Sequence, residues 1–136
     1  MPTDSTSPTV PRPLKLAALV VAIEGFLVAV LGVAEAITID SSRLVLGLTT
    51  AAFLILYGVG LVVVARGLLR RATWSRGPTV FAQLIQLGVA WSFWGGSTRW
   101  VSILLAIAAV VALVAVFQRA STDALADDPT RDGPAL

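Results

Sequence analysis

The sequence contains no cysteine and no histidine, and charged residues make up only 13% of its 136 positions. Disulfides and thiolate chemistry are therefore excluded, as are the commonest metal ligand and the usual general base. Soluble domains carry about 25% charged and about 45–50% apolar residues, whereas this chain has 57% hydrophobic residues. Such a composition, with a mean hydropathy of +0.87, is typical of a protein embedded in lipid.

Apolar runs divide the chain into four predicted transmembrane helices. A helix needs about 20 apolar residues to cross a hydrocarbon core of about 30 Å. Runs of this length, or close to it, cover residues 14–37, 44–65, 78–96 and 101–117. Pro78 opens the third run at a position where helices tolerate proline. The predicted fold is an all-α, four-helix integral membrane bundle in one domain, 14–117.

Polar segments flank these runs. Residues 1–13 are rich in proline, serine and threonine, which predicts a disordered cytoplasmic tail. Residues 66–77 form a predicted arginine-rich loop between the second and third spans. After Arg119, four aspartates and two prolines predict that helix does not continue beyond about Asp127, so 118–136 is expected to be a largely disordered tail.

The distribution of lysine and arginine predicts the orientation. Cytoplasmic segments retain positive charge. Eight cations fall on one predicted side, namely Arg12, Lys15, Arg66, Arg70, Arg71, Arg76, Arg119 and Arg131, whereas only Arg43 and Arg99 fall on the other. This distribution predicts a multi-pass membrane protein with both termini in the cytoplasm.

A cleaved signal peptide is the alternative for the first apolar run, because Ala34 and Ala36 flank Glu35 in an Ala-x-Ala pattern. Against it, Glu24 interrupts the run, which is longer than the usual ~7–15 apolar residues. We therefore expect an uncleaved helix.

Polar residues inside the spans are the candidate functional residues, because a charge at membrane depth costs about 2.5–3.5 kcal/mol even on lenient scales. Glu24 lies near the middle of the first span, and Glu35 follows on nearly the same helix face, about 16 Å further along. A proton or cation site at Glu24, with Glu35 at its mouth, is the functional hypothesis. A structural glutamate that joins helices is the alternative. Gln86 is expected at the depth of Glu24, which predicts a hydrogen bond between them.

Three further groups of residues complete the set of candidates. Gln83 shares a helical stripe with Gln86, and Tyr57 is either a third member of the polar site or a packed aromatic. Small residues at helical spacing predict a seam for close helix packing. The seam consists of Gly25, Ala29, Gly32 and Ala36, and the arginines that could bind lipid headgroups are Arg66, Arg70, Arg71 and Arg76.

No P-loop, metal-ligand cluster or nucleophile elbow occurs in the sequence. The arginines lie beside apolar spans and form no basic face for nucleic acid. We therefore expect no enzymatic activity, cofactor, metal or nucleic-acid partner. The expected partners are the lipid bilayer and either a second copy or a larger membrane complex, bound through the seam.

Two resemblances bear on this interpretation. The segments PRPLKLAALVVAIEGFLVAVLGVAEAI, LYGVGLVVVARGLLRRATWSRGP and QLIQLGVAWSF resemble uncharacterised small integral membrane proteins of actinobacteria. That resemblance covers about residues 11–126 and implies a four-helix plasma-membrane protein, without chemistry. Glu24 is also similar in placement to the embedded glutamate of small multidrug resistance transporters, which implies proton-coupled transport. Those transporters are shorter and lack the long tails and the four-arginine loop.

Overall fold

The computed structural model describes residues 9–92 and 94–127, and all regular structure within them is helical. The helices are α1 (Arg12–Ile37), α2 (Leu44–Leu69), α3 (Arg76–Ser92), α4 (Arg99–Phe117) and α5 (Arg119–Ala126). Short 3-10 turns, Ser41–Arg43, Thr73–Ser75 and Gly96–Thr98, precede α2, α3 and α4. The predicted all-α class is confirmed. Most of the two predicted tails, 1–8 and 128–136, lies outside the described residues.

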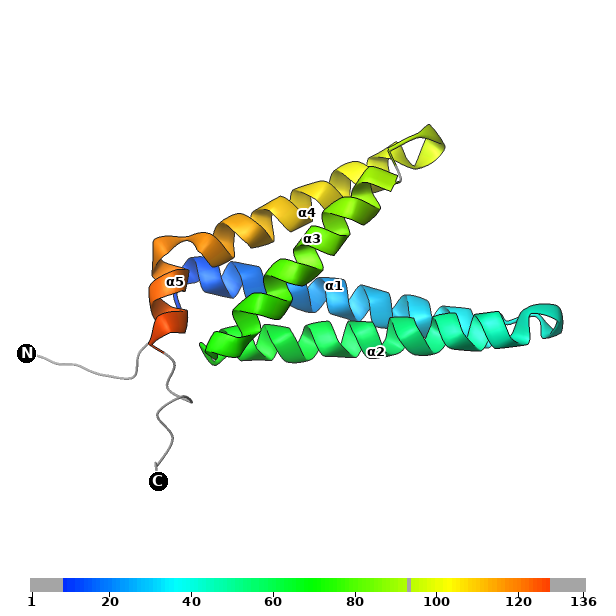
Figure 1. The fold of residues 1–136 in the computed structure, drawn as a ribbon, viewed down its shortest axis with the longest axis horizontal. Coiled ribbons are helices and arrows are strands. Elements are labelled where there is room, and N and C mark those ends of the chain that lie inside the picture. The colour runs from blue at the N-terminus through cyan, green and yellow to red at the C-terminus, as the bar shows by residue number, and fades with distance from the viewer. Residues whose placement is uncertain (1–8, 93, 128–136) are drawn as a thin grey trace, which may run out of the picture.

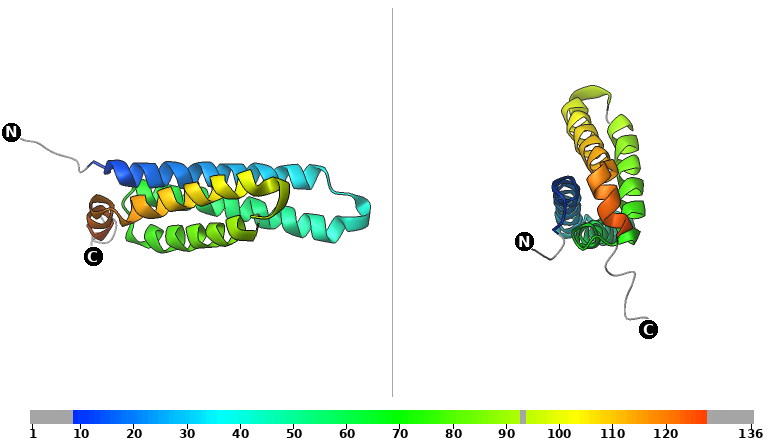
Figure 2. Two further views of the ribbon diagram at one scale, coloured as in Figure 1. Left: turned by 90° about the horizontal axis from the view of Figure 1, so that it is seen from above. Right: turned by 90° about the vertical axis from the view of Figure 1, so that its left-hand side faces the viewer.

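Two helical hairpins make up the molecule. α1 and α2 lie side by side, and α3 and α4 form a second hairpin that diverges from the first (Figure 1). α5 lies crosswise at the end where α1 begins, α2 ends, α3 begins and α4 ends (Figure 2). We call this the α5 end, and the opposite end the far end.

Three helical segments are long and apolar enough to cross a membrane: Arg12–Ile37, Ser41–Leu69 and Arg99–Phe117. Their outward faces are apolar, since Ile37 and Val45 are each 79% exposed. A helical protein embedded in a membrane is therefore the class that the fold defines. α3 has 17 residues and is not among these three segments.

The structure differs from the prediction at the start of the expected loop 66–77. α2 continues to Leu69, so Arg66 is helical, because arginine is a good helix former. The helix ends where Arg71 adopts φ = 56°. The Ala72 N–H then donates to the Gly67 carbonyl at 2.8 Å, and the Arg71 N–H to that of Leu68 at 3.0 Å. This is a Schellman motif, with an arginine where glycine is usual.

The other boundaries also differ from the prediction. α3 begins at Arg76 and ends at Ser92, four residues before the predicted limit of 96. Gly96, the first residue of the turn before α4, has φ = 88°, a conformation that favours glycine. Arg119–Ala126 is helical where a largely disordered tail was expected. Its Leu125 is 1% exposed, so burial of this side chain at the bundle's end stabilises the helix.

The seam residues Gly25 and Gly32 pack against α2. A Cβ at Gly25 would lie 2.6 Å from the Gly58 carbonyl oxygen, and one at Gly32 would lie 3.0 Å from the Ala51 carbonyl oxygen. The two backbones are therefore in direct contact. Ala29 is half-buried and Ala36 is exposed. Because α2 covers Gly25 and Gly32, this part of the seam is not available to a separate partner, contrary to the expectation above.

Candidate functional site

A polar cluster connects α1, α3 and α4 inside the bundle. The Gln83 Nε2 of α3 donates to Glu24 Oε2 of α1 at 2.8 Å. The Gln86 Nε2 donates to Glu24 Oε1, also at 2.8 Å, and to the Leu105 carbonyl of α4 at 3.0 Å. The structure thus contains the predicted bond between Glu24 and Gln86, and adds a second amide and a backbone carbonyl.

Helical spacing brings the two glutamines together. Gln83 and Gln86 are three residues apart, so both side chains lie on one face of α3. One turn beyond Gln86 on that face lies Ala90, whose carbonyl accepts a hydrogen bond from the Ser102 hydroxyl of α4. These contacts attach α3 to α4, and the two glutamines attach α3 to α1.

The amide of Gln86 has a fixed orientation. Both of its acceptors, the Glu24 carboxyl and the Leu105 carbonyl, face Nε2, and a carbonyl can only accept. Reversing this amide would place its oxygen against the Leu105 oxygen. Gln86 is therefore the donor in both bonds.

Gln83 has an unused acceptor. Its side chain is 0% exposed, and Oε1 is buried with no hydrogen-bond partner among the described residues. In this orientation Nε2 donates to a carboxyl oxygen of Glu24, which an ionised carboxylate can accept. With the amide reversed, Oε1 would accept a hydrogen from a protonated Glu24. The cluster can therefore accommodate both forms of the carboxyl.

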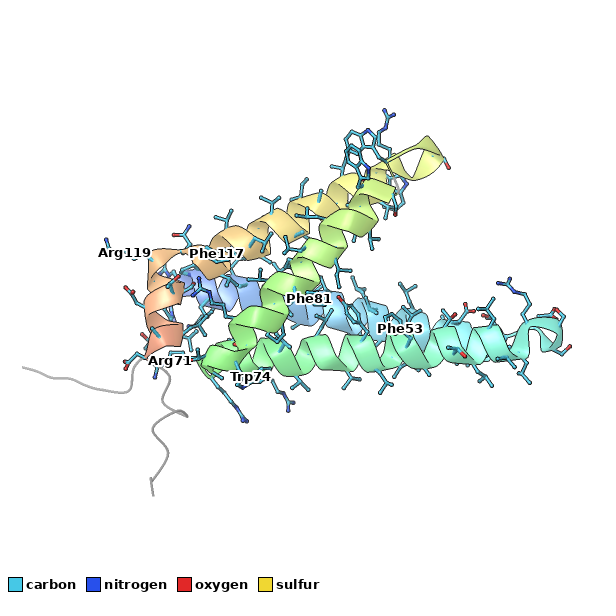
Figure 3. All side chains as sticks on the ribbon, viewed as in Figure 1. Phe53, Arg71, Trp74, Phe81, Phe117 and Arg119 are labelled. Carbon is cyan, nitrogen blue, oxygen red and sulfur yellow. The ribbon has the colours of Figure 1, made fainter. Side chains whose placement is uncertain are left out.

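The other polar candidates lie apart from this cluster or at its edge. Tyr57 stacks on Phe53, with ring centroids 5.8 Å apart (Phe53 is labelled in Figure 3), and its phenol lies within electrostatic range of Glu24. Glu35 lies toward the far end, where it lines a small cavity of about 160 Å³ with Asp40 and Arg43. The structure thus brings Glu24 together with the two glutamines, with Tyr57 nearby, and leaves Glu35 out.

Asp40 organises the turn between α1 and α2. Its carboxylate accepts hydrogen bonds from the Ser42 backbone N–H and hydroxyl, each at 2.8 Å. These bonds, the backbone one first, hold the pKa of Asp40 below its usual value.

The four arginines of the predicted lipid-binding set fall into different environments. Arg66 of α2 and Arg70, the residue that follows the helix, are exposed, whereas Arg71 is 8% exposed. Arg76 lies over the Phe117 ring, 5.0 Å from its centroid. Figure 3 shows Arg71, Trp74 and Phe117 near the α5 end. Arg66 and Arg70 are therefore the exposed members of this set.

Sequence analysis missed some of the contacting groups. The Leu105 carbonyl gives no sequence signal, since every residue carries one. Two contacts that hold α5 were also missed: the Ser121 hydroxyl donates to the Ala115 carbonyl at 2.7 Å, and Thr73 to the Leu125 carbonyl at 2.6 Å. The spacing of Ser121 and Leu125, four residues apart, could have predicted one buried face of a short helix.

The described residues contain no group of three or more histidine, cysteine or acidic side chains that could hold a metal. No protein-family model matches this chain, and neither curated proteins nor solved structures give a significant match. The two resemblances described above therefore remain predictions.

Proposed function

We propose that this chain is a non-enzymatic binding or accessory protein of a bacterial plasma membrane, with four spans and both termini in the cytoplasm. Counting four spans requires that α3, which is not among the three long apolar segments, also crosses the membrane. Although α3 is short, it pairs antiparallel with α4 and forms hydrogen bonds to α1. A partner helix that crosses the bilayer takes α3 across with it. Seven cations of the described residues lie at the α5 end, and Arg43 and Arg99 lie at the far end. This distribution supports a cytoplasmic α5 end.

Reporter fusions test this topology. A reporter inserted after Gly77 and one at the C-terminus should both report the cytoplasm. A fusion after Asp40 provides the matched control and should report the exterior. A periplasmic signal from either of the first two would refute the four-span arrangement.

One observation carries the non-enzymatic role: both carboxyl oxygens of Glu24 accept hydrogen bonds from glutamines of α3. The half-buried carboxyl therefore joins the two hairpins through hydrogen bonds. Interhelical hydrogen bonds of this kind contribute about 0.6 kcal/mol each on average in membranes, with a maximum of about 1.7.

Two substitutions at Glu24 test this role. Glu24→Gln keeps the size and acceptor oxygen, and its amide can donate to a reversed Gln83, so stability in detergent should change little. Glu24→Leu removes both bonds and should lower the free energy of unfolding by about 1–3 kcal/mol, because the buried amide of Gln83 and the half-buried amide of Gln86 lose a partner. Equal stability of the two variants would contradict the joining role.

A partner, whether a second copy or a larger complex, has the far half of the α1–α2 hairpin available. Val45 and Leu56 are 79% and 72% exposed there. Because the sequence has no cysteine, a single cysteine at either position is the only thiol in the chain. Val45→Cys in native membranes should cross-link to a second copy or to a partner. The matched control Leu19→Cys, near the α5 end, should not cross-link.

Proton-coupled transport through Glu24 is the second candidate, and the buried, unpartnered Oε1 of Gln83 favours it. The Gln83 amide would reverse its orientation each time the Glu24 carboxyl gains or loses a proton. Proteoliposomes with an imposed pH gradient should then take up organic cations, and Glu24→Gln should abolish uptake while folding normally. If the wild type moves none of a panel of cations, this candidate is refuted.

A further inference from the structure

A groove runs along α1 and α2 from the α5 end. It has a volume of about 520 Å³, and its lining is apolar except for Lys15 and Arg66. The apolar lining consists of Ala18, Leu19, Ala22, Val62, Ala65 and Leu69. Lys15 is near the start of α1 and Arg66 near the end of α2, so both cations lie at the same end of the groove.

A second groove adjoins the first, because Arg66 lines both. It has a volume of about 340 Å³ and is lined by Arg66, Arg70 and Trp74 together with small or apolar residues of α2 and the turn. Arg70 caps the C-terminus of α2, one turn beyond Arg66, and its backbone N–H donates to the Arg66 carbonyl at 3.0 Å. Trp74 is 53% exposed, as is typical of tryptophans at headgroup level.

Neither groove is lined by an acidic residue. Within the described part of the chain, Lys15, Arg66 and Arg70 also form no ion pair. Three cations therefore face the two grooves without a neutralising group. Alanines at the bottom of the first groove leave the space: Ala18 is 2% and Ala65 3% exposed.

The dimensions match a lipid. From Lys15 to Ala22 is seven residues, or about 10 Å along α1, which is the upper part of an acyl chain. The cationic end coincides with the boundary between the polar and apolar parts of the sequence, where phosphates lie. A soluble phosphate would leave the apolar groove empty, whereas a phospholipid fills both parts.

We propose that the two grooves form one binding site for an anionic phospholipid. Lys15 and Arg66 bind the phosphate, an acyl chain lies over Ala18 and Ala22, and the rest of the headgroup lies between Arg70 and Trp74. The assignment of this site to the cytoplasmic leaflet rests on the topology proposed above, whereas lipid binding itself does not. Failure of the topology test would move the site to the other leaflet and leave lipid binding unchanged.

Native mass spectrometry of the purified protein tests the site, with phosphatidylglycerol and phosphatidylcholine of identical acyl chains as probes. The wild type should bind phosphatidylglycerol more tightly. Each cation near an anionic headgroup contributes about 1 kcal/mol. Replacing Lys15 and Arg66 with glutamine should therefore reduce the affinity ratio roughly 30-fold, which is about 2 kcal/mol at 1.4 kcal/mol per tenfold.

The matched control is Arg43→Gln with Arg99→Gln, which removes two cations from the far end. It has the same net charge as the first variant and should keep the preference for phosphatidylglycerol. Both variants retain an excess of cations on the proposed cytoplasmic side. An equal loss of preference in both variants, or no preference in the wild type, would overturn the proposal.

A third variant tests the groove without altering charge. Ala22→Leu fills the apolar part and should weaken binding of both lipids by a similar factor, while the ratio between them stays near the wild-type value. Unchanged binding of both lipids to a folded Ala22→Leu protein would overturn the placement of the acyl chain.

Discussion

Gly58 lies in the interface between α1 and α2, and its replacement by alanine gives a quantitative test of the fold. A Cβ at Gly58 would lie 2.5 Å from the Gly25 carbonyl oxygen and 2.6 Å from the Ala29 nitrogen. Ordinary contacts begin at 3.4 Å, so the helices would have to separate by up to 0.9 Å (3.4 minus 2.5). Overpacking of this kind costs about 1–3 kcal/mol.

Gly60 is the matched control, two residues away on the same helix, because a Cβ there would have nothing within 4 Å. Both substitutions gain about 0.5–1 kcal/mol from replacing a glycine inside a helix. This gain cancels between the two variants. The free energies of unfolding of Gly58→Ala and Gly60→Ala should therefore differ by about 1–3 kcal/mol, with Gly58→Ala the less stable.

The measurement is equilibrium unfolding in mixed detergent micelles, followed by far-UV circular dichroism. Gly60→Ala should be as stable as the wild type or more stable. A difference below about 0.5 kcal/mol would refute the close approach, since the overpacking range starts at twice that value. Replacing both Gly25 and Gly32 with leucine adds more side-chain volume to the same interface and should weaken it further.

Three further outcomes are expected. Ser121→Ala removes a hydrogen bond worth about 1 kcal/mol, so amide exchange in α5 should accelerate about fivefold; Ser92→Ala, whose serine is exposed, should leave α5 exchange unchanged. The pKa of Asp40 is lower in the folded protein than in the unfolded chain. The stability that its carboxylate gives to the α1–α2 turn is therefore fully present above the unfolded pKa and is lost as the pH falls through the folded pKa. The Ser42 amide shift should therefore titrate in acid by NMR, and Asp40→Ala should abolish that titration. Trp74→Ala opens space against Gly67 and should lower thermal stability in detergent modestly, whereas Trp91→Ala, at a 78% exposed position, should not.

The sequence predicted the long helices well because their signal is composition over many residues. The runs 14–37, 44–65 and 101–117 each lie within α1, α2 or α4. A helix end depends on a few backbone angles and is harder to predict. Arg71 takes the left-handed conformation that glycine usually supplies, so no residue type marked the end of α2.

The polar cluster was predicted only in part. Depth along the helices placed Gln86 opposite Glu24, because both spans run in the same direction. Depth alone could not assign Gln83 to the same carboxyl, since that depends on the rotation of α3 about its axis. α5 was missed because Arg119–Ala126 is short and polar on average, and its helix depends on burying Leu125 against the bundle.

The two hairpins have unequal lengths. α1 and α2 contain 26 residues each, or about 39 Å, whereas α3 and α4 contain 17 and 19, or about 26–28 Å. In the four-span arrangement proposed above, one hydrocarbon thickness of about 30 Å cannot match both hairpins when they stand parallel, so the longer pair must tilt more or protrude. The divergence of the hairpins in Figure 1 accommodates this mismatch. In that arrangement a thinner bilayer makes the α1–α2 pair tilt further than the α3–α4 pair, and the hydrogen bonds from Gln83 and Gln86 to Glu24 connect the two hairpins whose relative angle then changes.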